Sequence, residues 1–214
     1  MNKIELHNVV PKIFASREDI RSDIWRTEFT FERGKKYLVE AESGTGKSSM
    51  CSYLFGQRGD YMGDILFDGH DVRQYSVNDW SRLRKESMGI LFQDLKLFDE
   101  LTAWENVELK NRLTNTQSRE TILAWFEELG IADKVNARIG RMSYGQQQRV
   151  ALIRALCQTL DFLLLDEPIS HLDNRNSDIM RDIILRETAR QGAAIIATSI
   201  GKHMDINYDK VVRL

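Results

Sequence analysis

The chain has little cysteine, little proline and no long hydrophobic run. Its two cysteines, Cys51 and Cys157, lie in apolar helical contexts without metal-like spacing, so we expect free thiols in a reducing compartment. No apolar stretch approaches the roughly 20 residues needed to cross a bilayer. The N-terminus lacks the apolar run of a signal peptide. We therefore expect a soluble intracellular chain without direct membrane insertion, so that any membrane role comes through a partner.

Neither sign of charge dominates the chain. Its 214 residues include 32 acidic and 30 basic side chains, so no overall field recruits nucleic acid or a membrane surface. No internal repeat, low-complexity segment or Pro/Gly linker divides the chain, whose length allows a substantial core. The short basic run 82–85 is most simply a solvated helix face. We expect no nucleic-acid partner.

Apolar strands alternate with helices along the chain. Strands are predicted at 3–9, 25–31, 36–41, 88–92, 161–165, 193–197 and 211–214, the last with no regulatory tail after it. Helices are predicted at 47–55, 118–129 and 174–190. Ser118 can cap the second helix, and Gly130 can stop it. This alternation predicts an α/β domain, with the helical stretch between about 95 and 160 as a second layer.

Residues 41–48 (AESGTGKS) lie between a predicted strand and a predicted helix. That order directs successive backbone N–H groups and a helix N-terminus at one point, which forms an anion cradle. Lys47 would reach the β- and γ-phosphates of a nucleotide, and the Ser48 hydroxyl would ligate Mg²⁺. Ala41 replaces the first glycine of the phosphate-loop pattern, which is tolerable if its φ angle stays negative. The alternative is that this segment is only a Gly-rich turn in which the sequence GKS occurs by chance. The residues predicted to bind phosphate are Ser43, Gly44, Thr45, Gly46, Lys47, Ser48 and Ser49.

A second site element is the strand at 162–168 (FLLLDEP), which ends in two acids. At the carboxyl end of a parallel strand such side chains project into the ligand crevice. Asp166 would hold the Mg²⁺ shell. Glu167 is placed to polarise a water in line with the γ-phosphate. The alternative is that Asp166, Glu167 and Pro168 simply form a turn after a buried strand.

Five segments in this order resemble the ATP-binding cassette (ABC) ATPases over essentially the whole chain. They are 42–49 (ESGTGKSS), 91–94 (LFQD), 142–149 (MSYGQQQR), 163–168 (LLLDEP) and 170–173 (SHLD). The resemblance implies an α/β phosphate-loop NTPase of ABC type, with one ATPase domain over 1–214. Its parts would be a RecA-like core sheet, an N-terminal antiparallel β subdomain and a helical signature subdomain at about 95–160.

The resemblance also implies how the segment 142–149 acts. In this family it opens a helix whose N-terminus faces the γ-phosphate of ATP held by the other protomer. Ser143 and Gly145 would therefore bind nucleotide across a homodimer, and Gln146 belongs to the loop–helix junction that presents them. Gln93 would sense Mg²⁺ and link the site to the helical subdomain.

Two further assignments follow from the same resemblance. Asp173 belongs to the loop that crosses the dimer interface. Phe14 is a candidate for the aromatic side chain that stacks on adenine, with a place in the core as the alternative. ATP and Mg²⁺ are the implied ligands.

The branch that the chain most resembles contains the ATPases of lipoprotein-releasing, macrolide-export and cell-division transporters. Residues 89–109 are similar to the segment that, in this branch, forms a groove for a coupling helix of the membrane subunit. Leu95, Leu97, Phe98 and Leu101 could line that groove or pack beneath the helical subdomain. The implied partner is an integral-membrane permease, which would hold the ATPase at the cytoplasmic face of the membrane.

Three departures from the family pattern bear on activity. Ala41 replaces a phosphate-loop glycine, Tyr144 replaces the first glycine of the signature pair, and Ser199 stands where the family has a histidine that contacts the γ-phosphate. Two functions remain open: an active transporter ATPase, favoured by Glu167, and a low-turnover ATP-dependent clamp, favoured by Ser199. A coiled-coil DNA-maintenance ATPase is disfavoured because the segments 91–94 and 142–149 lie too close together in the sequence for a long insertion between them. A translation factor of this family normally resembles two fused copies of the ATPase domain, whereas this chain holds one.

Overall fold

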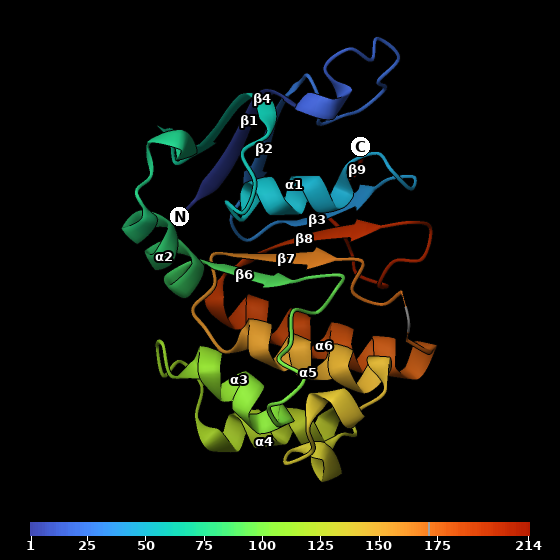
Figure 1. Ribbon diagram of the computed structural model, residues 1–214. Helices are drawn as coiled ribbons and strands as arrows, with labels where there is room; N and C mark the ends of the chain where they lie inside the picture. The colour runs from blue at the N-terminus through green and yellow to red at the C-terminus, as the bar shows by residue number, and fades with distance from the viewer. Residues whose placement is uncertain (171) are drawn as a thin grey trace.

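Helix α1 (Lys47–Leu54) lies between two β-sheets in the computed structural model, which describes residues 1–170 and 172–214 (Figure 1). The smaller sheet is antiparallel and has the strand order β2–β1–β4–β5. Its strands are β1 (Lys3–Pro11), β2 (Glu28–Glu32), β4 (Tyr61–Phe67) and β5 (His70–Asp71). This sheet is the N-terminal antiparallel subdomain that the sequence predicts.

The larger sheet is parallel, with the order β6–β7–β8–β3–β9. Its strands are β3 (Lys36–Glu40), β6 (Met88–Leu91), β7 (Phe162–Asp166), β8 (Ala194–Ser199) and β9 (Lys210–Arg213). Alternate residues of β7 enter different cores: Phe162 and Leu164 pack with α1 and the antiparallel sheet, whereas Leu163 and Leu165 pack with the helices on the other face. Burial on both faces explains the uninterrupted apolar run of this strand.

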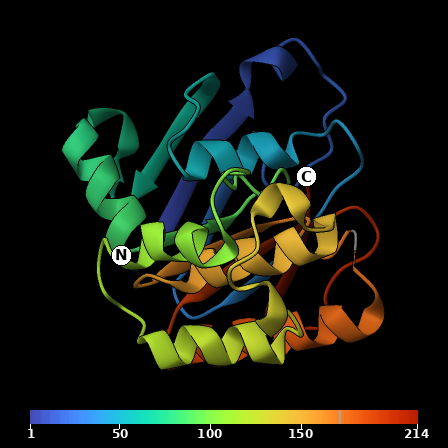
Figure 2. The same cartoon turned by 60° about the horizontal axis from the view of Figure 1, so that its bottom comes forward.

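The remaining helices cover the other face of the parallel sheet, apart from α2, which flanks its β6 edge (Figures 1 and 2). Helix α5 packs against β6, α3, α4 and α6. The bounds are α2 (Val77–Glu86), α3 (Ala103–Asn111), α4 (Arg119–Glu128), α5 (Tyr144–Leu156) and α6 (Asn174–Gln191), with 3-10 turns at Lys12–Phe14, Val72–Gln74, Ala132–Lys134 and Ile139–Arg141. In the described part of the chain, no helix is both long enough and apolar enough to cross a membrane.

Helix starts follow the local sequence closely. Ser118 caps α4 by accepting from the Thr121 N–H, and Gly130 follows the helix with a φ of 64°, as predicted. Thr102 and Glu105 form a capping box at the start of α3. These ends are determined by side chains within a few residues, which is why the sequence alone could predict the start and end of α4.

Two strand predictions need correction. The predicted strand 25–31 begins too early, because β2 starts at Glu28 while Trp25 and Arg26 lie in a turn, with Arg26 at a φ of 60°. Strand β4 was not predicted at all. Gly63 falls within it, opposite a register shift between His7 and Val10 of β1, so its apolar residues do not alternate regularly.

Candidate active site

Four predicted site segments meet at one edge of the parallel sheet. Glu40 of β3 is in register with Ser199 of β8, and Asp166 of β7 is in register with Thr198. Strand β6 lies on the other side of β7, so Gln93 follows at the same edge. Because all these strands are parallel, the loops after their carboxyl ends converge. The edge therefore gathers the phosphate loop, Gln93 and the Asp166–Glu167 pair.

The segment 41–46 forms a loop between β3 and α1. Gly44 and Gly46 have φ angles of 82° and 103°, which L side chains rarely adopt. Gly46 is the N-cap of α1 and has no side chain that could cap the helix, so no side chain of the N-cap occupies the first N–H groups of α1 beside the loop. Ala41 is not among the residues with positive φ, so its methyl group is accommodated. The loop has the geometry of an anion cradle.

Two buried aromatic rings pack against this loop. Trp25 is buried and donates from Nε1 to the Thr45 carbonyl oxygen at 3.0 Å. A Cβ atom added at Gly46 would lie 3.3 Å from both the Trp25 and Phe14 rings. Trp25 was missed as a site residue because its alternation with Thr27 and Phe29 predicted a strand. Only the turn at Arg26 brings its ring under the loop.

Phe14 lies beside a cavity of ≈ 670 Å³ that opens next to the phosphate loop. Its side chain is 8% exposed, and the Arg17 guanidinium lies 4.6 Å from the centre of its ring. Phe14 therefore belongs to the core and also borders the cavity. Thr45 and Glu42 contribute to the same lining.

Lys47, Glu167 and Gln93 form a charged cluster at the loop. Lys47 is 6% exposed, and its Nζ lies 3.6 Å from Oε1 of Glu167 and donates to the Glu42 carbonyl oxygen at 3.1 Å. Gln93 Nε2 donates to Oε2 of Glu167 at 3.5 Å. A buried ammonium group requires such a counter-charge. Glu167 has a φ of 50°, a left-handed conformation that is uncommon for glutamate and recurs at functional sites.

Thr198 connects the two acids from the neighbouring strand. Its hydroxyl donates to Oδ1 of Asp166 at 2.8 Å and accepts from the Glu167 N–H at 3.2 Å. Ser199, the next residue, is 2% exposed and donates from Oγ to the Lys202 carbonyl oxygen at 2.8 Å. The Ser199 hydroxyl is therefore used within its own turn, whereas Thr198 fixes the Asp166 carboxylate and the backbone of Glu167. Thr198 is not among the site residues predicted from the sequence.

The three glutamines of 142–149 each hold a different part of the signature segment. Gln146 closes a capping box with Ser143, whose N–H donates to Oε1 of Gln146 at 3.0 Å. Gln147 Nε2 donates to the carbonyl oxygens of Ile139 and Met142 in the preceding turn. Gln148 Nε2 donates to the Pro168 carbonyl oxygen at 2.6 Å, next to Glu167. These amides fix the start of α5, while Ser143 itself is exposed.

Tyr144 joins the signature segment to the loop after β6. Its hydroxyl donates to the Gln93 carbonyl oxygen at 2.5 Å. Burial, with a smaller contribution from the negative charges of Asp94 and Glu167, raises the pKa of Tyr144, so the phenol keeps its proton at neutral pH. A glycine at this position could not make this contact.

Other predicted residues have local partners. Asp173 caps α6 by accepting from the Asn176 N–H at 2.8 Å, which lowers the pKa of its carboxyl group. Ser49 Oγ accepts from Arg58 at 2.9 Å, whereas Ser43 and Ser48 are exposed. His171, within the predicted segment 170–173, lies outside the described residues.

The predicted groove residues divide between the surface and the core. Phe98 is 54% exposed and lines a cavity of ≈ 240 Å³ between α3 and α5. Leu95 is 3% exposed and packs in the core beneath α5, as does the partly buried Leu97, so the packing alternative holds for both. Leu101 is half-buried.

The donor set at the sheet edge suits a metal that is shared with a phosphate ligand. Among the described residues, no three His, Cys, Asp or Glu side chains gather closely enough to hold a metal by themselves. Mg²⁺ is commonly bound by one or two protein oxygens together with substrate phosphates. Ser48 and Asp166 fit that requirement, because Asp166 ends β7 and Ser48 lies just after the loop that follows β3, at the same edge.

Comparisons with known proteins agree with this arrangement. A family model described as "ABC transporter" matches residues 25–170. The chain is 30% identical to the uncharacterized ABC transporter ATP-binding protein Rv0986 of Mycobacterium tuberculosis, with 94% of this chain and 82% of that protein covered. It is 27% identical to the lipoprotein-releasing system ATP-binding protein LolD of Buchnera aphidicola, with 90% and 85% covered.

A solved structure shares the fold. The dimeric cassette MJ0796, in a post-hydrolysis state bound to ADP and Pi, superimposes with a TM-score of 0.77 at 24% identity. The match covers 92% of this chain and 87% of that chain. The similarity supports the two-sheet architecture and its helical layer.

Proposed function

The chain belongs to the ABC transporter family as an ATP-binding subunit homologous to LolD and MacB, and from this we propose that two copies close on ATP and drive a membrane permease. The proposed unit is one cassette over 1–214, with 95–160 as its helical subdomain. The permease would hold it at the cytoplasmic face of the membrane. MJ0796, which is described as dimeric, supports the paired arrangement.

The observation that carries this proposal is the cluster of Lys47, Glu167 and Gln93 at the phosphate loop. We propose that the γ-phosphate displaces Glu167 from Lys47, which then neutralises phosphate charge. The released Glu167 orients the attacking water and accepts its proton. Gln93, which is hydrogen-bonded to Glu167, would move with it and so transmit the change to the helical layer. When bound, Mg²⁺ would supply charge neutralisation at the phosphates, held by Ser48, Asp166 and Gln93.

We propose that the second half of each site comes from the other copy. Ser143 and Gly145 lie at the N-terminus of α5, where backbone N–H groups and the helix dipole favour a phosphate. Gln146 supports Ser143 through the capping box, and Asp173, the N-cap of α6, belongs to the loop expected at the interface. The exposure of Ser143 in a single chain is consistent with this role.

The alternative is a clamp that responds to ATP occupancy with little turnover. The observation that favours it is Ser199, whose hydroxyl donates to the Lys202 carbonyl oxygen. A single-turnover measurement of ATP hydrolysis, with the permease present, distinguishes the two. Hydrolysis in step with conformational change of the permease supports the motor. Conformational change on ATP binding, with the ATP left intact, supports the clamp.

Changing Ser199 to His should raise the rate of ATP hydrolysis. An imidazole reaches farther than a hydroxymethyl group and can donate to the γ-phosphate. A well-placed transition-state contact is worth about a hundred- to thousand-fold in rate, so a partial gain of at least about tenfold is expected. Ser199→Ala is the matched control, because it removes the bond to Lys202 without adding a donor, and it should leave the rate unchanged. An unchanged or lower rate in Ser199→His would remove the argument for slow turnover.

Changing Trp25 to Phe should weaken nucleotide binding more than catalysis. The substitution keeps a ring beneath Gly46 but removes the Nε1–H···O bond to Thr45. A hydrogen bond of this kind contributes about 1 kcal/mol, so the KM for ATP should rise roughly fivefold. The value of kcat at saturating ATP should stay within about twofold. Trp104→Phe, on α3, is the control. A fall in kcat with KM unchanged would contradict a loop-positioning role.

A further inference from the structure

The hydroxyl group of Tyr144 lies outside the roles proposed for its neighbours. Tyr144 is the first residue of α5 and lies between Ser143 and Gly145, which are assigned to nucleotide binding. Its side chain is 39% exposed, and its hydroxyl donates to the carbonyl oxygen of Gln93, 51 residues away in the sequence. Neither Ser143 nor Gly145 requires this hydroxyl in order to bind a phosphate. What the hydroxyl does for the site depends on the loop that contains Gln93.

The loop after β6 has a backbone conformation that needs support. Leu95 and Lys96 have φ angles of 58° and 50°, so two consecutive residues with side chains lie in the left-handed region. Such conformations raise the free energy of the folded chain and persist where the surrounding contacts impose them. Leu95 is buried in the core beneath α5, whereas Gln93 and Asp94 just before it are exposed. Burial therefore does not hold Gln93 in place.

Helix α5 supplies hydrogen-bond donors to this loop from both of its ends. Tyr144, at the start of the helix, donates to the Gln93 carbonyl oxygen at 2.5 Å. Arg154, in the last turn, donates to the carbonyl oxygens of Leu95 and Lys96 at 2.6 and 2.7 Å. The three carbonyl groups belong to the two left-handed residues and to Gln93 itself. Donors on one helix thus stabilise the loop in its left-handed conformation.

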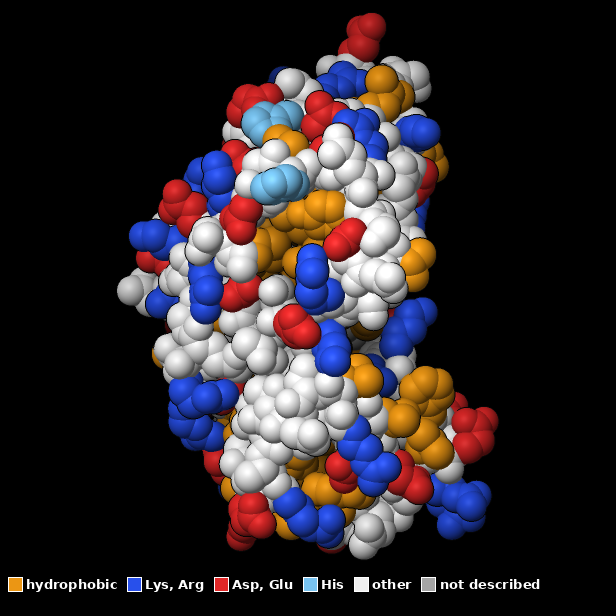
Figure 3. Space-filling view, turned by 90° about the vertical axis from the view of Figure 1, so that its left-hand side faces the viewer, with side chains coloured by type: hydrophobic (Ala, Val, Ile, Leu, Met, Phe, Trp, Pro, Cys, Tyr) orange, Lys and Arg blue, Asp and Glu red, His pale blue; other side chains and the backbone are white. Residues whose placement is uncertain are grey.

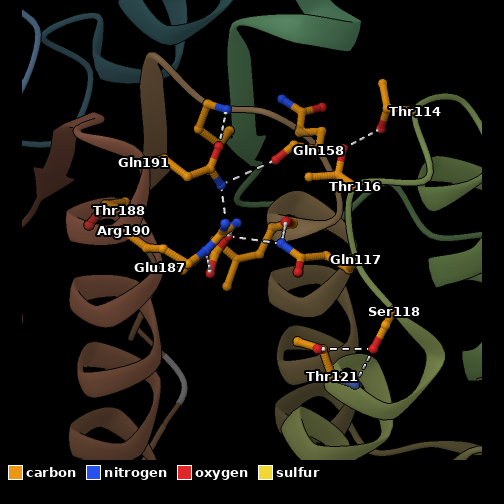
Figure 4. A network of polar contacts seen from close by, with 12 residues as sticks. Thr114, Thr116, Gln117, Ser118, Thr121, Gln158, Glu187, Thr188, Arg190 and Gln191 are labelled. Carbon is orange, nitrogen blue, oxygen red and sulfur yellow. Dashed lines mark hydrogen bonds and ion pairs between the residues drawn. The ribbon is translucent and has the colours of Figure 1, made fainter.

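Helix α5 is itself attached to the elements behind it. Near its start, Gln148 donates to the Pro168 carbonyl oxygen in the loop after β7. At its end, Gln117 Nε2 donates both to the Leu156 carbonyl oxygen at 3.3 Å and to Oε1 of Glu187 at 2.8 Å. Figure 4 shows Gln117 and other polar side chains converging on Glu187 of α6. These contacts make α5 a fixed support for the loop after β6.

The loop also borders open space. The cavity of ≈ 240 Å³ between α3 and α5 is lined by Phe92 and Phe98, which flank the segment 93–96 in the sequence. In Figure 3 a notch indents the right-hand edge of the molecule, with hydrophobic side chains gathered below it. Because the surface beside the loop is hollowed, the loop has room to shift when one of the donors on α5 is lost.

We propose that Tyr144 is a positioning residue, whose hydroxyl holds the Gln93 backbone so that the Gln93 amide stays within reach of Glu167 during ATP hydrolysis. Gln93 Nε2 lies 3.5 Å from Oε2 of Glu167, so a small displacement of the loop would break this hydrogen bond. The inference rests on the proposed function, since it uses the roles proposed there for Gln93 and Glu167. It adds a residue that acts on the reacting groups only through Gln93.

Tyr144→Phe tests whether the hydroxyl holds the loop, because it removes the hydroxyl and keeps the ring. Hydrogen–deuterium exchange of the full chain without nucleotide is followed by mass spectrometry of a peptide that covers 91–98. Exchange in this peptide should become about fivefold faster, since one hydrogen bond fewer opposes local opening. Tyr75→Phe is the matched control, because Tyr75 packs against Trp80 of α2, and it should leave the exchange unchanged. Unchanged exchange in Tyr144→Phe would overturn the proposal.

Steady-state ATP hydrolysis by the full chain tests the effect on the reaction. Tyr144→Phe should lower kcat about fivefold, because the amide of Gln93 is then less often in place. The KM for MgATP should stay within about twofold, since the phosphate loop is unchanged. A higher KM with an unchanged kcat would place the hydroxyl in nucleotide binding and would reject the positioning role.

A double-mutant cycle with Gln93→Ala separates positioning from a general effect on the fold. Gln93→Ala keeps the carbonyl group to which Tyr144 donates, but removes the amide whose position is in question. If Tyr144 acts through that amide, adding Tyr144→Phe to Gln93→Ala should not lower kcat further. Two independent reductions of kcat would contradict the proposal.

MgATP binding, measured by isothermal titration calorimetry, distinguishes this inference from the proposed function. The affinity of Tyr144→Phe for MgATP should stay within about twofold of that of the unmodified chain. Independent reductions in the cycle, with MgATP binding intact, reject only the role of Tyr144. Absence of MgATP binding in the unmodified chain rejects the proposed function.

Discussion

Glu167→Gln should reduce ATP hydrolysis by about 10²- to 10⁴-fold, the range by which a positioned general base contributes. The substituted amide cannot accept a proton from the attacking water. It also removes the negative charge that lies 3.6 Å from Lys47, so ATP should bind at least as tightly as before. A control is Glu127→Gln, an exposed substitution on α4, which should leave the rate unchanged. A rate within tenfold of the unmodified chain would mean that another group acts as the base.

The same substitution should also reveal the dimer. Without hydrolysis, the γ-phosphate continues to bridge the phosphate loop of one copy and Ser143 of the other. Light scattering should then show the 24.8 kDa chain doubling in mass when ATP is added. ADP should not produce this change, since it lacks the bridging phosphate. Bound ATP without any change in mass would contradict the assignment of Ser143 and Gly145 to the opposite site.

Lys47→Ala should abolish most MgATP binding. Lys47 is buried at the start of α1, and its ammonium group is the cation closest to Glu167 at the loop. A hydrogen bond to a charged group contributes about 1.5–3 kcal/mol, which corresponds to roughly a 10- to 100-fold loss of affinity. The loss should fall at or above the upper end, because Glu167 would then face the phosphates without its counter-ion.

Isothermal titration calorimetry with MgATP measures this effect directly. Lys12→Ala is the matched control, since Lys12 is exposed in the 3-10 turn that contains Phe14 and carries the same charge. Its affinity should stay close to that of the unmodified chain. If Lys47→Ala binds MgATP as tightly as the control, the loop at 41–46 is not the phosphate site.

The sequence by itself indicated the family, predicted the strands of the parallel sheet in their order along the chain, and predicted where the phosphate loop lies. These features depend on contiguous residues. The run AESGTGKS carries its own backbone requirements, the strand ending in Asp166 and Glu167 is apolar throughout, and Ser118 and Gly130 bound α4 through local hydrogen bonds and a positive φ. Local chemistry of this kind needs no knowledge of the rest of the chain.

Only the tertiary structure decided which distant side chains meet. Trp25 supports Thr45 from 20 residues away, and Tyr144 reaches the Gln93 carbonyl oxygen across 51 residues. Thr198 fixes Asp166 because β7 and β8 are adjacent in the sheet. The segment 142–149 does not itself indicate that its glutamines donate to the carbonyl oxygens of a nearby turn and of Pro168. A glutamine amide can donate to any carbonyl oxygen that the fold brings near it. Contacts between separate elements depend on strand order and helix packing, which periodicity along one segment does not specify.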